Sequence, residues 1–306
     1  MENKRWREPR TWVELFAFFN LAGLAPDILL AHSTNRFHAP AEWVPLVYSA
    51  ACPLLLAPAL WSLMKGRPAA WRVLGNVAGW IAIAIGVAGL VLHLKSQFFE
   101  QRTLASLVYA APFAAPLAYT GIGLLLLLNR SIEAGTREWS EWVVFLALGG
   151  FVGNFIFSVT DHAQNGLYRE LEWIPVIASA LGVGFLVTPL LVRVGDAYLK
   201  LCFAMLALQA VVGVAGFVLH LEADLRGHGR NLFETIVHGA PVFAPMLFPD
   251  LALLAGIGLW TLGGVGARNL TIAATEGGGP QSDDCGYGGV SGGASGRAWG
   301  GRPGSR

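Results

Sequence analysis

Charged residues are scarce in this sequence. Asp, Glu, Lys and Arg make up 13% of its 306 residues, which is about half of the share usual in soluble domains. The net charge of +1 gives no surplus of either sign that would attract nucleic acid or an acidic partner. Three cysteines, none of them in a CxxC pair, exclude a disulfide framework and a dithiol redox site. What the chain has in abundance is apolar, since 54% of its residues are hydrophobic.

Long apolar runs dominate the chain up to its last forty or so residues. Each run is close to the roughly 20 residues that a helix needs to cross a bilayer. The runs cover residues 13–32, 43–64, 71–94, 104–128, 140–162, 173–194, 197–221 and 236–262. We therefore predict an all-α, polytopic integral membrane protein with about eight transmembrane helices.

The sequence also matches itself at a spacing near 130 residues. Residues 42–50, EWVPLVYSA, match 172–180, EWIPVIASA, at five of nine positions, and 85–94 match 212–221 at eight of ten. Residues 111–116 resemble 240–245, and His32 and Asn35 fall at the same offset as His162 and Asn165. Four matches in the same order predict a duplication. Each half has an even number of helices, so both enter the membrane in the same direction.

The repeat divides the chain into three parts. Residues 1–130 and 131–270 form the two four-helix membrane repeats. Residues 271–306 are rich in Gly and Ser and have almost no aliphatic side chains, so we predict a disordered, Gly-rich cytoplasmic tail. The loops on the N-terminal side hold twelve Lys and Arg against six on the other. This bias predicts both termini in the cytoplasm, in a bacterial inner membrane.

The duplication preserves a candidate site on the outer side of the membrane. His32, His93, His162 and His220 end outward-running helices, and Glu42 and Glu172 begin inward-running ones. Three unmatched histidines are predicted on the same side: His38, His228 and His238. Imidazole with carboxylate is a common ligand mixture for first-row metals, and two His with one carboxylate is a non-haem iron set. These residues predict a metal site that binds non-haem iron, copper or zinc, or haem held between His93 and His220.

Structural explanations exist for the same residues. Glu at a helix start favours the positive end of the dipole, and His in a last turn can bond free carbonyls. The glycines around His93 and His220 favour close helix packing. Pro116 and Pro245 each remove the amide that would bond the carbonyl four residues back. That loss leaves a free carbonyl beside the histidines. The carbonyl is a ligand, or the broken hydrogen bond makes a hinge or a packing kink in the helix.

One acid is predicted deep in the membrane. Asp250 falls near the middle of the last run, and the matched position in the first half is Gly121. Ionisable groups at that depth usually face the bundle or water. We interpret Asp250 as part of an ion or proton path, alongside Asn20, Asn154 and Gln209, or as a group bonded to a neighbouring helix.

Four functions remain open from the sequence. The first is a metal- or haem-binding membrane protein that acts in electron transfer or oxidation, with a redox partner or a second copy of the chain as partner besides the lipid bilayer. The second is a transporter or channel for a metal ion or proton-coupled solute. The third is an intramembrane zinc hydrolase using Asp161, Ser49 or Ser179, which no local nucleophile motif supports. The fourth is a structural membrane subunit without a site.

Overall fold

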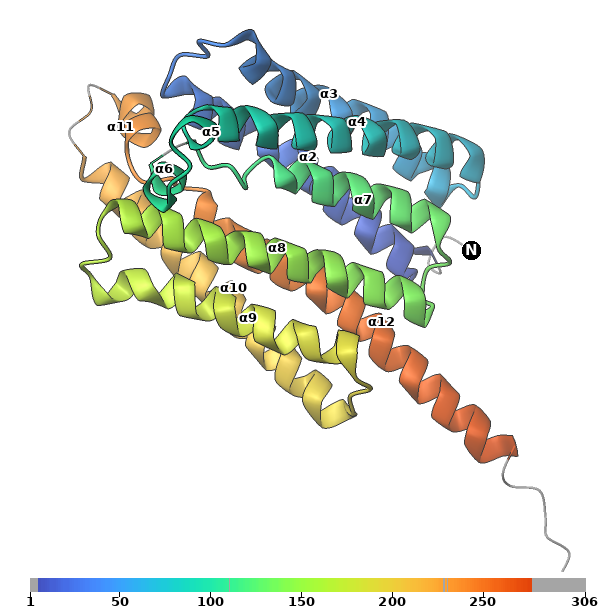
Figure 1. Ribbon diagram of the computed structural model, residues 1–306. Coiled ribbons are helices and arrows are strands. Elements are labelled where there is room, and N and C mark those ends of the chain that lie inside the picture. The colour runs from blue at the N-terminus through green and yellow to red at the C-terminus, as the bar shows by residue number, and fades with distance from the viewer. Residues whose placement is uncertain (1–4, 110, 228, 230, 277–306) are drawn as a thin grey trace, which may run out of the picture. The chain divides into compact units, whose positions relative to one another are not determined.

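The computed structural model describes residues 5–109, 111–227, 229 and 231–276 (Figure 1). All regular secondary structure among these residues is helical. Residues 277–306, in which we predict a disordered tail, lie outside the described residues, and so does His228.

Seven helices among the described residues are long and apolar enough to cross a membrane. They are α2 (Pro9–Ser33), α3 (Trp43–Met64), α4 (Pro68–Lys95), α8 (Arg137–Gln164), α9 (Trp173–Leu191), α10 (Asp196–Leu225) and α12 (Leu247–Glu276). Proline at the first position of α2 and α4 suits a helix start, because that amide has no partner in the helix. The prediction of a helical membrane protein is confirmed.

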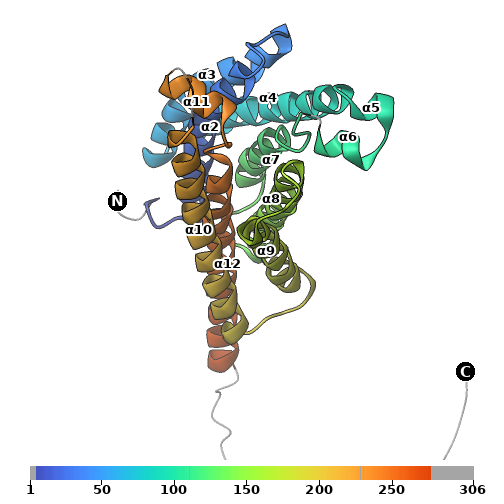
Figure 2. The ribbon, with the colours of Figure 1, turned by 90° about the vertical axis from the view of Figure 1, so that its left-hand side faces the viewer.

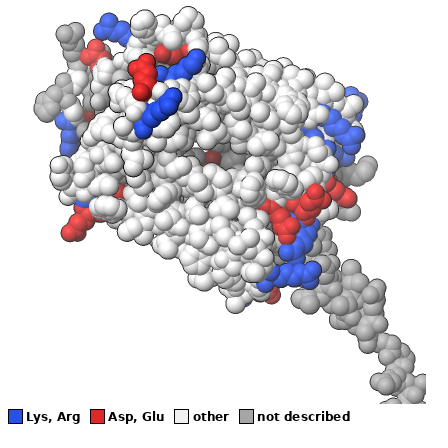
Figure 3. All heavy atoms as spheres, viewed as in Figure 1, with Lys and Arg blue, Asp and Glu red and all other residues white. Residues whose placement is uncertain are grey.

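The distribution of polar and apolar side chains fits a lipid surrounding. Figure 3 shows charged side chains gathered towards the two ends of the helices, with a nearly uncharged band between them. Large apolar side chains in this band point outwards: Leu54 is 76% exposed and Trp80 64% exposed. Polar groups such as Ser49 and Gln209 are completely buried instead. Apolar groups outside and polar groups inside are the arrangement that a bilayer favours.

The helices pack in sequence order. Helix α2 packs against α3, α3 against α4, and α4 closely against α7 (Leu117–Ser131), while α8 packs against α9 and α9 against α10. Helices α7 and α8 lie side by side, and so do α10 and α12 (Figures 1 and 2). The α2–α3 and α8–α9 connections and the short helices α5, α6 and α11 lie at the same end of the bundle. We call this the histidine end, and the other the opposite end.

Of the roughly eight expected spanning helices, the fourth, at 104–128, is not among the seven candidates that the described residues form. This stretch forms α6 (Leu104–Val108) and then, after a non-helical stretch, α7, which at 15 residues is too short for a regular span. Helix α5 (Phe98–Gln101) precedes them. Pro112 lies within the break and Pro116 at its end, and a proline can neither donate a helical hydrogen bond nor fit inside the preceding turn. The apolar run is therefore continuous in sequence but not in structure.

The last run, 236–262, breaks in a similar way. Helix α11 (Leu232–His238) ends near its start, and a 3₁₀ turn, η3 (Ala244–Met246), leads into α12. Asp250 consequently lies in the first turn of α12 rather than near the middle of a long helix, as expected from the run. Pro241 and Pro245 mark this break.

Small residues let the helices after these breaks approach their neighbours. A Cβ added to Gly86 of α4 would lie 2.8 Å from the carbonyl oxygen of Pro116, and one added to Gly213 of α10 would lie 2.6 Å from that of Pro245. Both distances are too short for any side chain. The interpretation of these glycines as packing positions is confirmed.

Candidate metal centre at the histidine end

The first set consists of His32, Glu42 and His93, and the structure brings all three together. His32 lies in the last turn of α2, Glu42 ends the 3₁₀ turn η1 (Pro40–Glu42), and His93 lies in the last turn of α4. The Nδ1 atom of His32 is 3.7 Å from Oε2 of Glu42. The centroids of the His32 and His93 rings are 6.2 Å apart.

The second set consists of His162, Glu172 and His220, from the end of α8, the turn η2 (Glu170–Glu172) and the last part of α10. Its two ring centroids are 6.4 Å apart, with an interplanar angle of 78° against 76° in the first set. Glu172 interacts electrostatically with His162, as Glu42 does with His32. Here Asp161 adds a further carboxylate, which interacts with His220.

Similar loop conformations bring His and Glu together in both sets. Phe37 and Leu167 adopt the left-handed backbone conformation, with φ of 51° and 52°, and each is preceded by another residue with positive φ. The amides of Phe37 and Leu167 donate to the carbonyls of His32 and His162, at 3.0 and 3.1 Å. These bonds end the helix and turn the chain back towards the next one.

The carbonyls of Pro112 and Pro241 fix the second histidine of each set. Nδ1 of His93 lies 2.9 Å from the carbonyl oxygen of Pro112, and Nδ1 of His220 lies 3.0 Å from that of Pro241. A carbonyl can only accept, so Nδ1 carries the proton and Nε2 of a neutral ring presents its lone pair. The prediction that Pro116 and Pro245 lie inside helices and leave these carbonyls free is wrong. Helices α7 and α12 begin only at Leu117 and Leu247, and the two carbonyls also accept from the amides of Ala115 and Ala244, each at 3.1 Å. The carbonyls nevertheless lie beside the histidines and orient the rings.

The carboxylates retain unused acceptor capacity. Asn35 donates to Oε1 of Glu42 at 2.9 Å. The other oxygen, Oε2, is buried without a hydrogen-bond partner among the described residues, and the same holds for Oε2 of Glu172. A buried carboxylate oxygen without a donor is costly unless a cation lies beside it.

The side chains as placed do not enclose a metal ion: in the part of the chain that the structure describes, no three His, Cys, Asp or Glu side chains are close enough to hold one. Metal–nitrogen bonds near 2.1 Å put the centroids of two imidazoles at tetrahedral or octahedral cis angles on one ion roughly 4.5 to 5.5 Å apart. The rings of each set, at 6.2 and 6.4 Å, are therefore farther apart than in a bound site. Approach of the rings and rotation of the glutamate towards them would complete either set.

The other predicted residues lie apart from these contacts. His38 and His238 are exposed, and no ring contact or ion pair joins them to a set within the described ranges. His93 and His220 each face the other histidine of their own set. Asp250 accepts a hydrogen bond of 2.8 Å from Asn20 of α2, which is the predicted bond to a neighbouring helix.

The serines considered for a hydrolase are engaged elsewhere. Ser49 bonds to the hydroxyl of Tyr119, and Ser179 donates to the carbonyl of Pro175 at 2.7 Å. Tyr119 in turn donates to the carbonyl of Pro45 at 3.0 Å, and the neighbouring Tyr48 donates to that of Ala78 at 2.6 Å. These bonds make both serines structural.

A buried ion pair at the opposite end was missed by the sequence reasoning. Arg130 binds both oxygens of Glu14, at 2.8 and 2.9 Å, and Asn129 donates to the same carboxylate. The guanidinium also lies over the ring of Trp71, and Trp139 donates to Asn129. Both charged side chains are only 2% exposed. An acid in the first apolar run was the available signal, since such a charge needs a partner.

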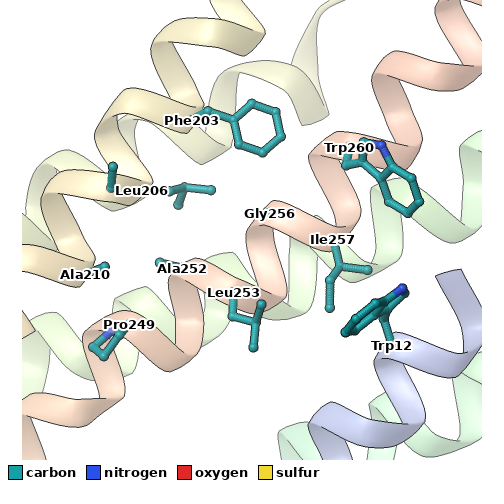
Figure 4. A pocket seen from close by; sticks show the side chains of 11 residues that line it. Trp12, Phe203, Leu206, Ala210, Pro249, Ala252, Leu253, Gly256, Ile257 and Trp260 are labelled. Carbon is teal, nitrogen blue, oxygen red and sulfur yellow. The ribbon is translucent and has the colours of Figure 1, made fainter. Parts of the chain in front are cut away.

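An apolar pocket of about 610 Å³ lies away from both sets (Figure 4). Helices α10 and α12 form most of its wall, and Trp12 of α2 and Trp260 of α12 lie at one end. Its lining has no ionisable or metal-binding side chain, so it cannot supply the chemistry predicted for the histidines.

No family model matches the sequence, and neither a curated protein nor a solved structure is significantly similar to it.

Proposed function

We propose that the chain is a membrane metalloprotein that holds one first-row transition-metal ion in each His–Glu–His set. We further propose that it arose by duplication, with residues 1–130 as the first half and 131–270 as the second. The recurrence of the ring pairs, the reversed loops and the proline carbonyls at matched positions supports both statements.

One observation carries the proposal. In both sets a histidine has its Nδ1–H directed to a backbone carbonyl, while a buried carboxylate oxygen has no donor among the described residues. Metal-binding histidines are usually held in this way, because the bond on one nitrogen orients the lone pair of the other towards the ion. A purely structural histidine would not require the unpaired glutamate oxygen.

The ligand set favours a redox role. Two histidines and one carboxylate leave positions open on the ion for a small molecule, as in non-haem iron oxygenases. Iron is thus the preferred ion, with copper or zinc as alternatives. Haem between His93 and His220 is less well supported, because each ring faces a histidine and a glutamate of its own set. We propose electron transfer or oxidation at the histidine end as the activity.

The excess of Lys and Arg in the loops of the opposite end favours a cytoplasmic location for that end and for both termini. The histidine end would then face the outside of a bacterial inner membrane. A membrane-impermeant amine reagent added to intact cells should modify the protein at Lys95 and spare Lys65. Modification of Lys65 alone would show that the protein has the opposite orientation in the membrane.

Metal analysis of the purified protein tests the proposal. We expect one ion per set in the wild type, loss of one ion in His93→Ala or His220→Ala, and loss of both in the double variant. His38→Ala, which changes an exposed histidine outside the sets, is the matched control. A metal-free wild type that takes up neither Fe²⁺ nor Co²⁺ on titration would overturn the proposal, and a Soret band that requires His93 and His220 would replace it with haem binding.

Transport is a second candidate because of Asp250. Its hydrogen bond with Asn20 lies within two membrane-spanning helices, where ionisable groups commonly mark ion paths. Metal uptake by vesicles that carry the wild type, abolished by Asp250→Asn while the ions in the sets remain, would favour transport. Uptake equal to that of empty vesicles would exclude it.

A further inference from the structure

A line of polar side chains leads inwards from the second set. Asn154, Ser158 and Asp161 are spaced by four and three residues on α8, so they share one face of the helix. Asn154 is 2% exposed and Ser158 7%. Asp161, at the end of the line, interacts with His220.

The three matched positions in the first half are apolar, although Asp27 lies on the same face of α2. Counting from His32 as from His162, the positions of Asn154, Ser158 and Asp161 are occupied on α2 by Leu24, Ile28 and Ala31. Gln209 of α10 likewise corresponds to Ala82 of α4, counting from His220 and His93. The polar line therefore belongs to one half only and is not needed to build the histidine sets.

Contacts along α9 place Asn154 and Gln209 at the same level. The Phe151 ring lies against Gly182, and α8 and α9 run in opposite directions. Asn154, one turn after Phe151, therefore lies beside the turn of α9 that precedes Gly182 and contains Ala178. Gln209 donates to the carbonyl of Ala178 at 2.7 Å. Both amides thus border the same turn, from α8 on one side and α10 on the other.

Each amide has one unsatisfied atom, and the two are complementary. Nδ2 of Asn154, a donor, and Oε1 of Gln209, an acceptor, have no hydrogen-bond partner among the described residues. Gln209 is completely buried. Buried polar groups are nearly always hydrogen-bonded to protein or to ordered water, and an internal water can bond a donor and an acceptor together.

We propose that water binds between α8, α9 and α10, bridging Asn154 and Gln209 and continuing along Ser158 to Asp161 and His220. The second half then has a hydrated path from the histidine end into the bundle, which can carry protons, whereas the first half has apolar residues at the four matched positions. This inference does not require a metal ion in either set.

Cysteine labelling tests the path in full-length protein whose own cysteines, Cys52, Cys202 and Cys285, are replaced by alanine. The variants Ser158→Cys and Asn154→Cys report on the proposed path. Ile28→Cys and Leu24→Cys are their matched controls in the first half. The probe is a small, positively charged methanethiosulfonate, and the modified fraction is followed by mass spectrometry. Ser158→Cys is nearly isosteric, so it tests the path with little disturbance.

We expect both path variants to react about tenfold or more faster than their controls, because the reactive thiolate forms only where water has access. The rates of cysteine modification should be the same with and without a metal chelator. The labelling result therefore does not depend on whether the proposed metal sites exist. Slow reaction at Asn154→Cys, or equally fast reaction at Leu24→Cys and Ile28→Cys, overturns the inference. Size-exclusion profiles and helical circular dichroism show which variants are folded and are to be compared.

Discussion

The two histidine sets of the chain are closely alike, whereas matched residues at the opposite end differ in charge. At the histidine end, matched residues make matched contacts, down to the proline carbonyl that each second histidine bonds. At the opposite end the first half has Glu14, Arg130 and Gly75, where the second half has Val144, Leu259 and Cys202. Both versions are buried. A buried position can thus be filled with a bonded charge pair or with apolar groups, whereas the His and Glu residues of the histidine sets are the same in both halves.

Glu14→Ala should have the largest effect on stability. It removes one member of a fully buried pair and leaves Arg130 without its carboxylate, which costs about 3–5 kcal/mol in the free energy of unfolding. Denaturant unfolding in detergent micelles measures the loss. Glu141→Ala is the control, because its ion pair with Arg137 is exposed and contributes only about 0.5 kcal/mol.

A triple variant that copies the second half sharpens this comparison. Glu14→Val, Arg130→Leu and Gly75→Cys together remove both charges, and Cys fills the space where a Cβ at Gly75 now meets the Arg130 guanidinium. We expect its stability within about 1–2 kcal/mol of the wild type, because well-packed apolar groups commonly replace a buried pair without loss. A triple variant as unstable as Glu14→Ala would show that the pair is needed for more than filling the space.

Substitution of the glycines beside the helix breaks should have the next largest effect on stability. Gly86→Ala and Gly213→Ala each press a methyl group against a proline carbonyl, and we expect a loss of about 1–3 kcal/mol in each half. Gly121→Ala is the control, because a Cβ there meets nothing within 4 Å. Equal stability of Gly86→Ala and Gly121→Ala would contradict the packing.

The sequence predicted those parts of the molecule that repeat within it. His32, Glu42 and His93 could be grouped from the sequence alone, because their residue types recur with His162, Glu172 and His220 at near-constant spacing. The break in the fourth run was not predicted. Mean hydropathy over a long window is little changed by Pro112 and Pro116, but a helical backbone cannot continue through them. The Glu14–Arg130 pair also escaped, because its partners are 116 residues apart and its counterpart in the second half is apolar.

Asn20→Ala should cost less than the glycine changes. It removes the hydrogen bond that joins α2 to Asp250 of α12, and such bonds within membranes contribute about 0.6 kcal/mol on average. At the matched pair, α8 and α7 carry Gly150 and Gly121. Denaturant unfolding of Asn20→Ala beside the wild type measures the loss. A loss above about 3 kcal/mol in Asn20→Ala would instead indicate that Asp250 is charged and depends on the amide.

Tyr119→Phe should be the smallest change, because the second half already carries Phe248 at the matched position. The substitution removes the bonds of the Tyr119 hydroxyl to Ser49 and to the carbonyl of Pro45. Ser49 can then donate to a carbonyl one turn back, as Ser179 does to Pro175, so the net loss in the free energy of unfolding should be about 0.5–1.5 kcal/mol.

Tyr119→Phe should also keep the ion that we propose for the first set, since no residue of that set bonds Tyr119 in the described chain. If the ion is lost while the unfolding free energy holds, the tyrosine takes part in the metal centre, and the two halves differ at the histidine end after all.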